Sequence, residues 1–303
     1  MAPLKIACFG EAMIEMVAHA NSATATLGVA GDSLNTAIYL RRSLGAEHEV
    51  AFVSSIGVDP LSDRMARFIA AEGVSTRLLG RHPTKLPGLY SVDTDGAGER
   101  TFSYWRDSSA ARTLFEFREG PKLADLDEFH VVFASALSLA ILSATARDRF
   151  FSWLKRFRAR GGLFVFDSNF RPRLWQDIGT ARSEIERAWN CCDIALPSID
   201  DEMALFGDDD EAAILGRLRA YGLKRGAMKR GEHGPVLIGS GDGPLPPFAP
   251  AETVLDTTAA GDSFNGAFLG TYLTSGDSVA AAKAGHALAS LVVGHRGAII
   301  AKA

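Results

Sequence analysis

Short apolar segments alternate with amphipathic helical segments along almost the whole chain, and this alternation constrains the fold more than any other feature. Apolar runs suited to buried strands occur at residues 4–9, 50–56, 131–134, 163–167, 192–196, 226–229, 236–238 and 253–255. Helical periodicity is found at about 32–45, 60–73, 143–160, 211–221, 260–274 and 278–293. Strands that alternate with helices imply right-handed crossovers. We therefore predict an α/β fold with a mostly parallel central sheet that helices cover on both faces.

Helix start and stop signals agree with this reading. Asp59-Pro60 offers a capping side chain followed by proline at the first helical position, and Gly73 ends the same segment. Asp32 is expected to cap the first helix in the same way.

One region breaks the alternation. Residues 89–95 and 100–106 read as the two strands of a β-hairpin, in which Phe102, Tyr104 and Arg106 share one face. Together with residues 14–17 and 25–29, the hairpin is expected to form a small sheet that projects from the main domain. We expect one domain over residues 1–303, with the strands of the small sheet inserted at about 11–30 and 84–110.

Composition narrows the partners. The 303 residues include 32 Lys and Arg against 36 Asp and Glu, a formal net charge of −4, and no long basic run is present. Neither a nucleic acid nor an anionic membrane surface is the natural partner of such a chain. No uncharged apolar run approaches the ~20 residues of a membrane span. Three cysteines without a CxxC pair favour a reducing compartment, so we expect a cytoplasmic protein that acts on small molecules.

The most informative segment for chemistry is 256–268, DTTAAGDSFNGAF, at the start of an apolar helix. The N–H groups of Ala259, Ala260, Gly261 and Asp262 are expected to be unpaired there and to form an anion hole with the helix dipole, which suits a phosphoryl group. A carboxylate beside that hole is suited to accept a proton from a substrate hydroxyl, which makes Asp262 the candidate base. Alternatively, Asp262 only caps the helix.

Other enzyme classes lack their motifs. The chain contains no GxxxxGK[ST], no HExxH and no nucleophile elbow, and residues 9–11 begin no GxGxxG fingerprint. Hydrolase, zinc-enzyme and dinucleotide oxidoreductase readings therefore lose support.

The signature at 256–262 resembles that of the ribokinase-like (PfkB) carbohydrate kinases. The resemblance spans the chain and implies a three-layer sandwich in which the small β-sheet is a lid. It implies ATP and Mg²⁺ as cofactors, with Ser198, Lys229, Gly231 and Gly234 near the nucleotide. It also implies that Gly31, Asp32 and Asn35 bind the substrate.

Within that family, several segments are similar to the group that phosphorylates the terminal primary hydroxyl of 2-keto-3-deoxygluconate. This resemblance implies that Arg106 pairs with the substrate carboxylate. It also implies that Tyr90 and Tyr104 offer hydroxyl groups and ring faces to the sugar acid. Asn169 is likewise expected to bind the substrate. If Arg106 has no such role, it is a solvated charge on the hairpin.

Arg171 follows the strand at 163–167, where open α/β sheets place ligands. The resemblance implies that it contacts the transferring phosphate or the substrate; otherwise it pairs with Asp167 or Asp177. The Asn-x-x-Glu motif of the family, linked to magnesium, corresponds to Ser198 to Asp201 here, so Asp201 and Glu202 both stay open as the magnesium-side carboxylate. We expect ATP and water to hold most of the Mg²⁺.

Asp256 and Thr258 are, by family analogy, candidates to bind a monovalent cation such as K⁺. An ordinary aspartate at a strand end is an equally good explanation of Asp256.

Three alternatives stay open. They are a ribokinase-like kinase for fructose, ribose, a nucleoside or another keto-deoxy sugar acid, a non-catalytic sugar- or nucleotide-binding regulator, and a dinucleotide oxidoreductase. The exposed, apolar lid also predicts a homo-oligomer, a dimer or higher, that assembles through it.

Overall fold

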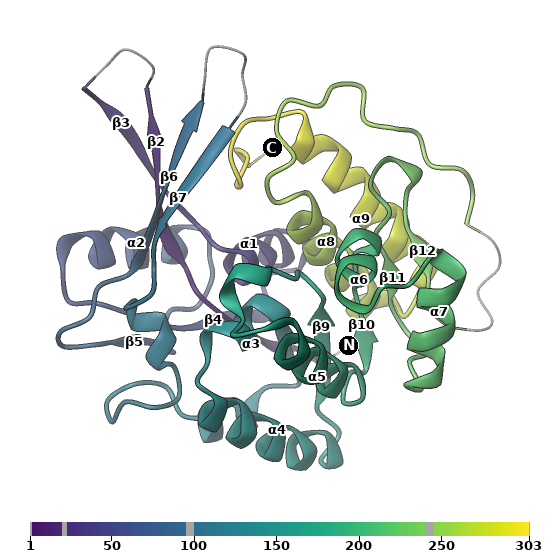
Figure 1. The fold of residues 1–303 in the computed structure, drawn as a ribbon, viewed down its shortest axis with the longest axis horizontal. Helices are drawn as coiled ribbons and strands as arrows, with labels where there is room; N and C mark the ends of the chain where they lie inside the picture. Colours follow the sequence, from purple (N-terminus) through teal and green to yellow (C-terminus); the bar gives the residue numbers. More distant parts are fainter. Residues whose placement is uncertain (1, 20–22, 95–99, 240–244, 303) are drawn as a thin grey trace.

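A parallel sheet lies at the centre of the computed structural model, which describes residues 2–19, 23–94, 100–239 and 245–302 (Figure 1). Its strand order is β10-β9-β8-β1-β4-β5, and every neighbouring pair is parallel. The strands are β1 (Lys5–Phe9), β4 (Glu49–Ile56), β5 (Leu79–Arg81), β8 (Val131–Ser135), β9 (Leu163–Asp167) and β10 (Ile194–Ala195). The mostly parallel central sheet is confirmed.

Helices cover both faces of this sheet. Successive strand residues point to opposite faces, so Phe9 belongs to one apolar core and Cys8 to the other. Helices on the Phe9 side are α3 (Ala136–Ile141), α4 (Ala144–Ala159), α5 (Ile178–Trp189), α6 (Ile199–Phe206) and α7 (Glu211–Ala220). Helices on the Cys8 side are α1 (Asp32–Ser43), α2 (Pro60–Ala71), α8 (Ala260–Ser275) and α9 (Ser278–Val293). The predicted three-layer sandwich is confirmed.

A second sheet of four strands projects from one end of the molecule (Figure 1). Its order is β3-β2-β6-β7, with β2 (Met13–Ala18), β3 (Ala25–Ala30), β6 (Gly88–Thr94) and β7 (Arg100–Trp105). Strands β2 and β6 pair in parallel and the other two pairs are antiparallel. All four lie within the segments 11–30 and 84–110 predicted for the lid; the hairpin turn at 95–99 falls outside the described residues.

Some predicted elements are wrong. Residues 253–255 are not a strand, because the N–H groups of Leu255 and Asp256 both donate to the carbonyl of Val293 at the end of α9. Strands β11 (Ala227–Met228) and β12 (Val236–Leu237) form a separate antiparallel pair. Strand β5 and helices α3, α5 and α6 were not predicted. Short 3₁₀ helices lie at η1 (Ala110–Thr113), η2 (Leu123–Glu128), η3 (Pro172–Leu174) and η4 (Gly231–His233).

The two predicted caps have different outcomes. Asp59 accepts from the N–H groups of Leu61 and Ser62, with Pro60 at the first position of α2, as predicted. Asp32 does not cap α1, because Gly31 holds the capping position and Asp32 is already helical. Its carboxylate is engaged across the sheet edge instead.

Helices α1 and α8 cross at very short range. A β-carbon on Gly266 would lie 2.7 Å from the backbone nitrogen of Leu40 and 2.6 Å from the β-carbon of Tyr39. One turn further along α8, a β-carbon on Gly270 would lie 2.6 Å from that of Ser43. These two glycines let the helix backbones approach, and the approach fixes the start of α8 against the start of α1.

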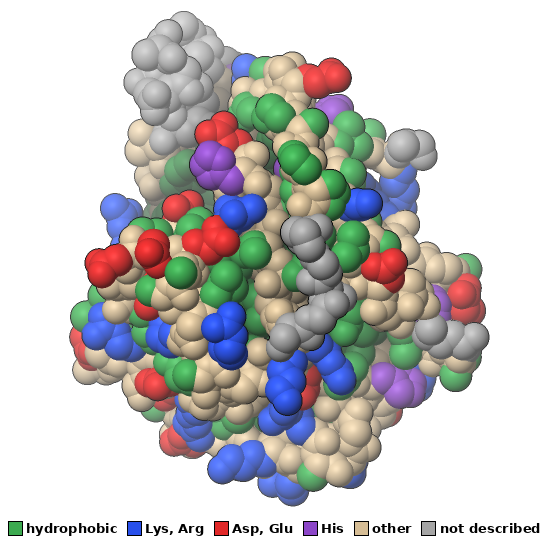
Figure 2. Space-filling model, turned by 90° about the vertical axis from the view of Figure 1, so that its right-hand side faces the viewer, with side chains coloured by type: hydrophobic (Ala, Val, Ile, Leu, Met, Phe, Trp, Pro, Cys, Tyr) green, Lys and Arg blue, Asp and Glu red, His purple; other side chains and the backbone are tan. Residues whose placement is uncertain are grey.

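The face of the molecule opposite the lid carries both signs of charge. Figure 2 shows a group of Asp and Glu side chains at the left of this face and others elsewhere on it, with Lys and Arg gathered along its lower edge. Within the described ranges, no helix is long and apolar enough to cross a membrane.

We predict that Gly266→Ala lowers the free energy of unfolding by ~1–3 kcal/mol, because the added methyl group meets backbone atoms that cannot move aside. Gly216→Ala is the matched control. Gly216 lies in α7 and has open space around it, so the substitution should raise stability by ~0.5–1 kcal/mol. Urea unfolding of the three proteins measures both values; equal effects would contradict the close crossing.

Candidate active site

The candidate site lies at the carboxyl edge of the central sheet. The loops that follow β1, β8 and β9 end there, and the N-terminal turns of α1 and α8 meet them. Open parallel sheets bind ligands at this edge, where the strand order reverses. In this sheet the reversal is at β1, which lies between β8 and β4.

Asp262 lies in the first turn of α8 and faces α1. Its Oδ2 accepts a hydrogen bond of 2.9 Å from Asn35 Nδ2, and α8 has no side-chain cap. The alternative that Asp262 only caps the helix is therefore wrong. Burial raises the pKa of Asp262 to about 7, and the negative charges of Asp32 and Asp167 add to the rise. A carboxylate with a pKa near neutrality is suited to accept a proton.

The backbone at the start of α8 forms most of the predicted anion hole. Ala259 precedes the helix in the left-handed conformation, with φ 60° and ψ 13°. In the described chain, no backbone acceptor pairs with the N–H groups of Gly261 or Asp262. The N–H of Ala260 was expected to be unpaired and is not, because it donates to the carbonyl of Thr257 at 3.2 Å. The left-handed residue tightens the turn enough for that bond.

Asp32 joins three elements at the same edge. Its Oδ2 accepts hydrogen bonds from Ser135 Oγ, directly after which α3 begins, and from Asn169 Nδ2 at 2.6 Å. Its other oxygen is buried without a hydrogen-bond partner among the described residues. Asp32, Asn169 and Asn35 are thus brought together as predicted for the substrate side, with Gly31 donating to Asn35 Oδ1 at 3.4 Å.

The lid turns one face toward this edge. Glu15, Tyr90 and Tyr104 are opposite one another on β2, β6 and β7. Tyr90 donates to Glu15 at 2.7 Å, and its ring centroid lies 5.8 Å from that of Tyr104. On the same face, Tyr90 packs in a small core with Ala298, against which Ala259 also packs. Tyr90 and Tyr104 therefore lie on the side of the lid that faces the start of α8.

Arg106 is buried at the base of the lid and paired within the chain. Its Nε donates to Glu11 Oε2 at 2.9 Å, and its Nη2 donates to the same oxygen. Both side chains are buried, so the alternative of a solvated hairpin charge is wrong. Glu11 accepts from two of the five guanidinium N–H groups, and within the described part of the chain no other acceptor binds the remaining three.

Lys229 is directed into the protein. Its ammonium lies 2.9 Å from Asp167 Oδ1 and 3.0 Å from Asn265 Oδ1, and Asn265 Nδ2 donates to Asp167 Oδ2 at 2.6 Å. After it, Gly231 and Gly234 bound the short helix η4, both with positive φ. The expected turn is present, but the lysine side chain contacts Asp167 and Asn265.

Arg171 projects from the loop after β9, and its side chain is 54% exposed. It pairs with Asp201 at 3.5 Å, so neither predicted alternative partner is correct. Asp177 caps α5 instead, and Asp167 binds Lys229. Burial raises the pKa of Asp201 to about 6, Asp167 adds to the rise, and Arg171 opposes it.

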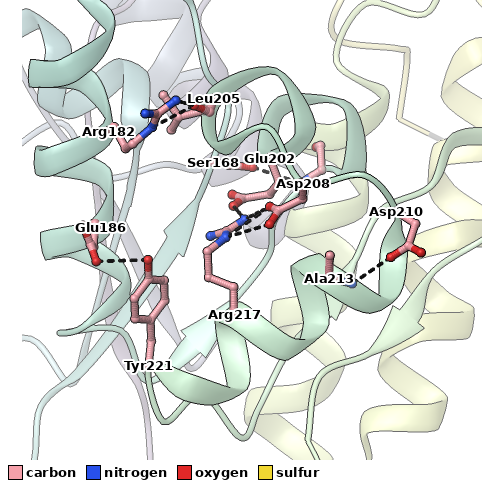
Figure 3. Close-up of polar contacts among 11 residues, drawn as sticks. Ser168, Arg182, Glu186, Glu202, Leu205, Asp208, Asp210, Ala213, Arg217 and Tyr221 are labelled. Carbon is pink, nitrogen blue, oxygen red and sulfur yellow. Dashed lines mark hydrogen bonds and ion pairs between the residues drawn. The ribbon is translucent and has the colours of Figure 1, made fainter.

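Asp201 and Glu202 point to different places. Glu202 is fully buried and pairs with Arg217 at 2.9 Å, beside Asp208, as Figure 3 shows. Burial raises the pKa of Glu202 to about 7, opposed mainly by Arg217. Glu202 therefore belongs to the junction of α6 and α7, and the carboxylate directed toward Arg171 is that of Asp201. Ser198 directly precedes α6, and its N–H donates to Ser168 Oγ at 2.9 Å.

Asp256 connects two loops. One oxygen accepts from the N–H of Thr258 at 3.0 Å, and the other accepts from the N–H of Gly297 at 2.8 Å. The carboxylate thus holds the segment before α8 against the chain after α9. Across the described residues, no group of three or more His, Cys, Asp or Glu side chains is arranged to hold a metal ion.

Three residues of this edge were missed by the sequence reasoning: Glu11, Asp167 and Asn265. Asn265 follows Asp262 by three residues, a spacing that puts both on one helix face. Glu11 directly follows the glycine that ends the first strand, and Asp167 ends another strand. Their positions were visible in the sequence, but their partners were not.

This edge can bind an anion beside a proton acceptor, which suits phosphoryl transfer to a small hydroxyl compound. Comparison with protein families agrees: residues 3–303 match the pfkB family of carbohydrate kinases, and the chain belongs to that family. Over 301 residues it is 40% identical to the 2-dehydro-3-deoxygluconokinase of Escherichia coli (strain K12), covering 98% of this chain and 97% of that protein.

Two solved structures share the fold. A fructokinase from Xylella fastidiosa with bound ATP has a TM-score of 0.81 and 27% identity, and covers 97% of this chain and 93% of that one. A fructokinase double mutant from Vibrio cholerae O395, with fructose, ADP and potassium ion bound, has a TM-score of 0.83 and 20% identity, and covers 98% and 94%. The ribokinase-like fold and the family resemblance are confirmed.

We predict that Glu202→Ala lowers the free energy of unfolding by ~3 kcal/mol, because it leaves Arg217 buried with only Asp208 as a charged partner. Asp201→Ala should change it by less than ~1 kcal/mol, because its ion pair with Arg171 is long and the Arg171 side of it is exposed. Urea unfolding of both variants compares the two; similar losses would show that Asp201 is as structural as Glu202.

Proposed function

We propose that this chain phosphorylates the terminal primary hydroxyl of 2-keto-3-deoxygluconate (2-dehydro-3-deoxygluconate) with ATP, which gives the 6-phosphate and ADP. The observation that carries the proposal is the position of Asp262. Asn35 holds its carboxylate at the start of α8, where two N–H groups have no backbone acceptor among the described residues. The E. coli relative, similar over nearly its whole length, supports the choice of substrate.

In this reaction Asp262 accepts the hydroxyl proton as the substrate oxygen attacks the γ-phosphorus. The bond from that phosphorus to the bridging oxygen breaks, and ADP leaves with the electron pair. The N–H groups of Gly261 and Asp262 and the helix dipole stabilise the charge on the transferring group. Arg171 is exposed at the same edge and is the second candidate to contact it, whereas Ala259 and Ala260 shape the turn.

The residues present suit Mg²⁺. Asp32, Asp167, Asp201 and Asp262 lie at one edge, so the site carries excess negative charge, and carboxylate oxygens are hard ligands. Asp201 is the residue that would hold the ion, mostly through water. Bound Mg²⁺ neutralises phosphate charge. Asp256, through its hydrogen bonds to the N–H groups of Thr258 and Gly297, stabilises the loop before α8, which is the proposed site of a monovalent cation.

The lid residues support a sugar acid as the acceptor. Arg106 keeps N–H groups that Glu11 does not use, and a carboxylate is the strongest acceptor for them. Tyr90 and Tyr104 overhang α8 from the same face of the lid. Asp32, Asn35 and Asn169 provide contacts for the substrate hydroxyls. Gly31 lets α1 begin close to the loop after β1, because a β-carbon there would lie 2.1 Å from the carbonyl oxygen of Glu11.

A neutral sugar such as fructose is the second candidate. The pairing of Arg106 with Glu11 favours it, because the pair has no net charge. A guanidinium that is already neutralised gains less from a substrate carboxylate than a free one.

A coupled ADP-release assay tests the proposed reaction. Selective turnover of 2-keto-3-deoxygluconate over its galactonate epimer, fructose, ribose and adenosine is expected, with a control that lacks acceptor. Asp262→Asn should lose at least ~10²-fold in kcat with little change in KM. In the wild type, kcat/KM should rise with pH through about 7, because the base must be deprotonated. Retained turnover in Asp262→Asn would contradict the role of the base.

Arg106→Ala separates the two acceptor classes. If Arg106 binds the carboxylate, the variant should raise KM for sugar acids by ~10- to 200-fold, because a charge-assisted hydrogen bond is lost, and change KM for fructose much less. Glu11→Gln removes the competing charge and keeps the size of the side chain, so it should increase the preference for the acid. An equal loss for acids and neutral sugars in Arg106→Ala would favour a structural pair.

We also propose a dimer or higher assembly through the lid. Trp105 and Leu86, each 59% exposed, border a groove of about 650 Å³ at the base of the lid, and exposed apolar surface of this kind favours association. Sedimentation of the wild-type chain tests the assembly, and a monomer at micromolar concentration would contradict it.

A further inference from the structure

Lys229 is buried where three elements of the site meet. Its side chain is 10% exposed. Its N–H donates to the carbonyl of Pro197 at 2.8 Å, and its carbonyl accepts from the N–H of Ile199 at 3.0 Å. The backbone of Lys229 is thus fixed to the start of α6, and its ammonium reaches Asp167 at the end of β9 and Asn265 in α8.

The three polar groups form a closed triangle. Lys229 binds Asp167 and Asn265, and Asn265 donates to the second oxygen of Asp167. Because Asn265 is one turn beyond Asp262, the triangle fixes the helix turn that carries the base. A β-carbon on Gly261 would lie 3.6 Å from Lys229 Nζ, so the ammonium lies directly against that turn.

The charges on the two sides of Asp262 differ. Asp32 of α1 and Asp167 of β9 are negative, and Lys229 is the cation whose charge opposes them. Asn35 donates a hydrogen bond without charge. Tyr39 of α1 also lies near Asp262 but is neutral, since burial raises its pKa. Without Lys229, the carboxylate of Asp167 would be buried next to Asp262 with no counterion.

We propose that Lys229 is a positioning residue: it joins Asp167 to Asn265 beneath the first turn of α8, holds Asp262 in place and neutralises Asp167 beside it. The inference rests on the proposed function, because it assumes that Asp262 is the base. It differs from the expectation that the lysine binds the nucleotide. Substitution of a residue that binds the nucleotide changes the KM for ATP, whereas substitution of a positioning residue changes the pKa of the base.

The test is the pH profile of kcat/KM for 2-keto-3-deoxygluconate in Lys229→Met, from about pH 5.5 to about pH 9. Loss of a neighbouring positive charge favours the protonated form of Asp262, so the acidic limb should move to higher pH. A change of about one pH unit lowers kcat/KM ~10-fold at pH 6 and little at pH 9. KM for ATP should change less than ~3-fold. Lys224→Met, an exposed lysine five residues earlier, is the matched control and should leave both unchanged.

A second variant keeps the test decisive if Lys229→Met is unstable. Asp167→Asn combined with Lys229→Met removes both charges, and replacing a buried pair together is far less damaging than breaking it. Because the net charge beside Asp262 is then that of the wild type, the acidic limb should return toward its original position. A purely structural role predicts no such return.

Two results would overturn the inference. One is a rise of at least ~10-fold in KM for ATP with an unmoved acidic limb, which a lost nucleotide contact predicts. The other is a uniform loss of kcat/KM at every pH with a lower Tm. Asp262→Asn separates this inference from the proposed function. If Asp262→Asn keeps its activity, the proposed function fails. If Asp262→Asn abolishes the acidic limb but Lys229→Met leaves that limb unmoved, only the inference fails.

Discussion

The close crossing of α1 and α8 is the constraint on which the rest of the site depends. Gly266 and Gly270 place no side chain of α8 between the two backbones, so the first turn of α8 lies against the first turn of α1. That contact brings Asn35 Nδ2 within 2.9 Å of Asp262 Oδ2, although the two residues are 227 positions apart in the sequence. Neither helix could place a base alone, because each contributes one partner of the hydrogen bond.

Charge balance at the sheet edge follows from this geometry. Four carboxylates, those of Asp32, Asp167, Asp201 and Asp262, are gathered at this edge, and among the described residues the cations of Lys229 and Arg171 oppose their charge. The raised pKa values of Asp201 and Asp262 reflect this imbalance together with burial. An edge of this kind favours a bound cation and disfavours a second anion, unless backbone N–H groups and a metal ion accompany the phosphate.

Much of the fold was predictable from the sequence because it depends on periodicity. Apolar runs identified the buried parallel strands, and the break in alternation identified the lid. The signature at 256–262 identified the turn before α8 and the carboxylate of Asp262 as the candidate site. The strand predicted at 253–255 failed because its backbone bonds to the end of α9, and sequence periodicity does not show which backbone will be the partner. Short helices such as α3 were missed for a similar reason, since a buried six-residue helix has no polar face.

The unpredictable part of the site consists of pairings between distant residues. Arg106 was recognisable as a charge on a strand face, but its partner Glu11 lies 95 residues away at the junction of core and lid. The same holds for Asp167, which connects Lys229 and Asn265. In both cases a cation expected to face a ligand is held by a carboxylate of the chain. A buried cation without a partner is costly in an empty site, so the fold supplies an internal partner. Two cations predicted to contact anionic ligands are thus neutralised within the protein, and under the proposed function a substrate carboxylate at Arg106 competes with Glu11.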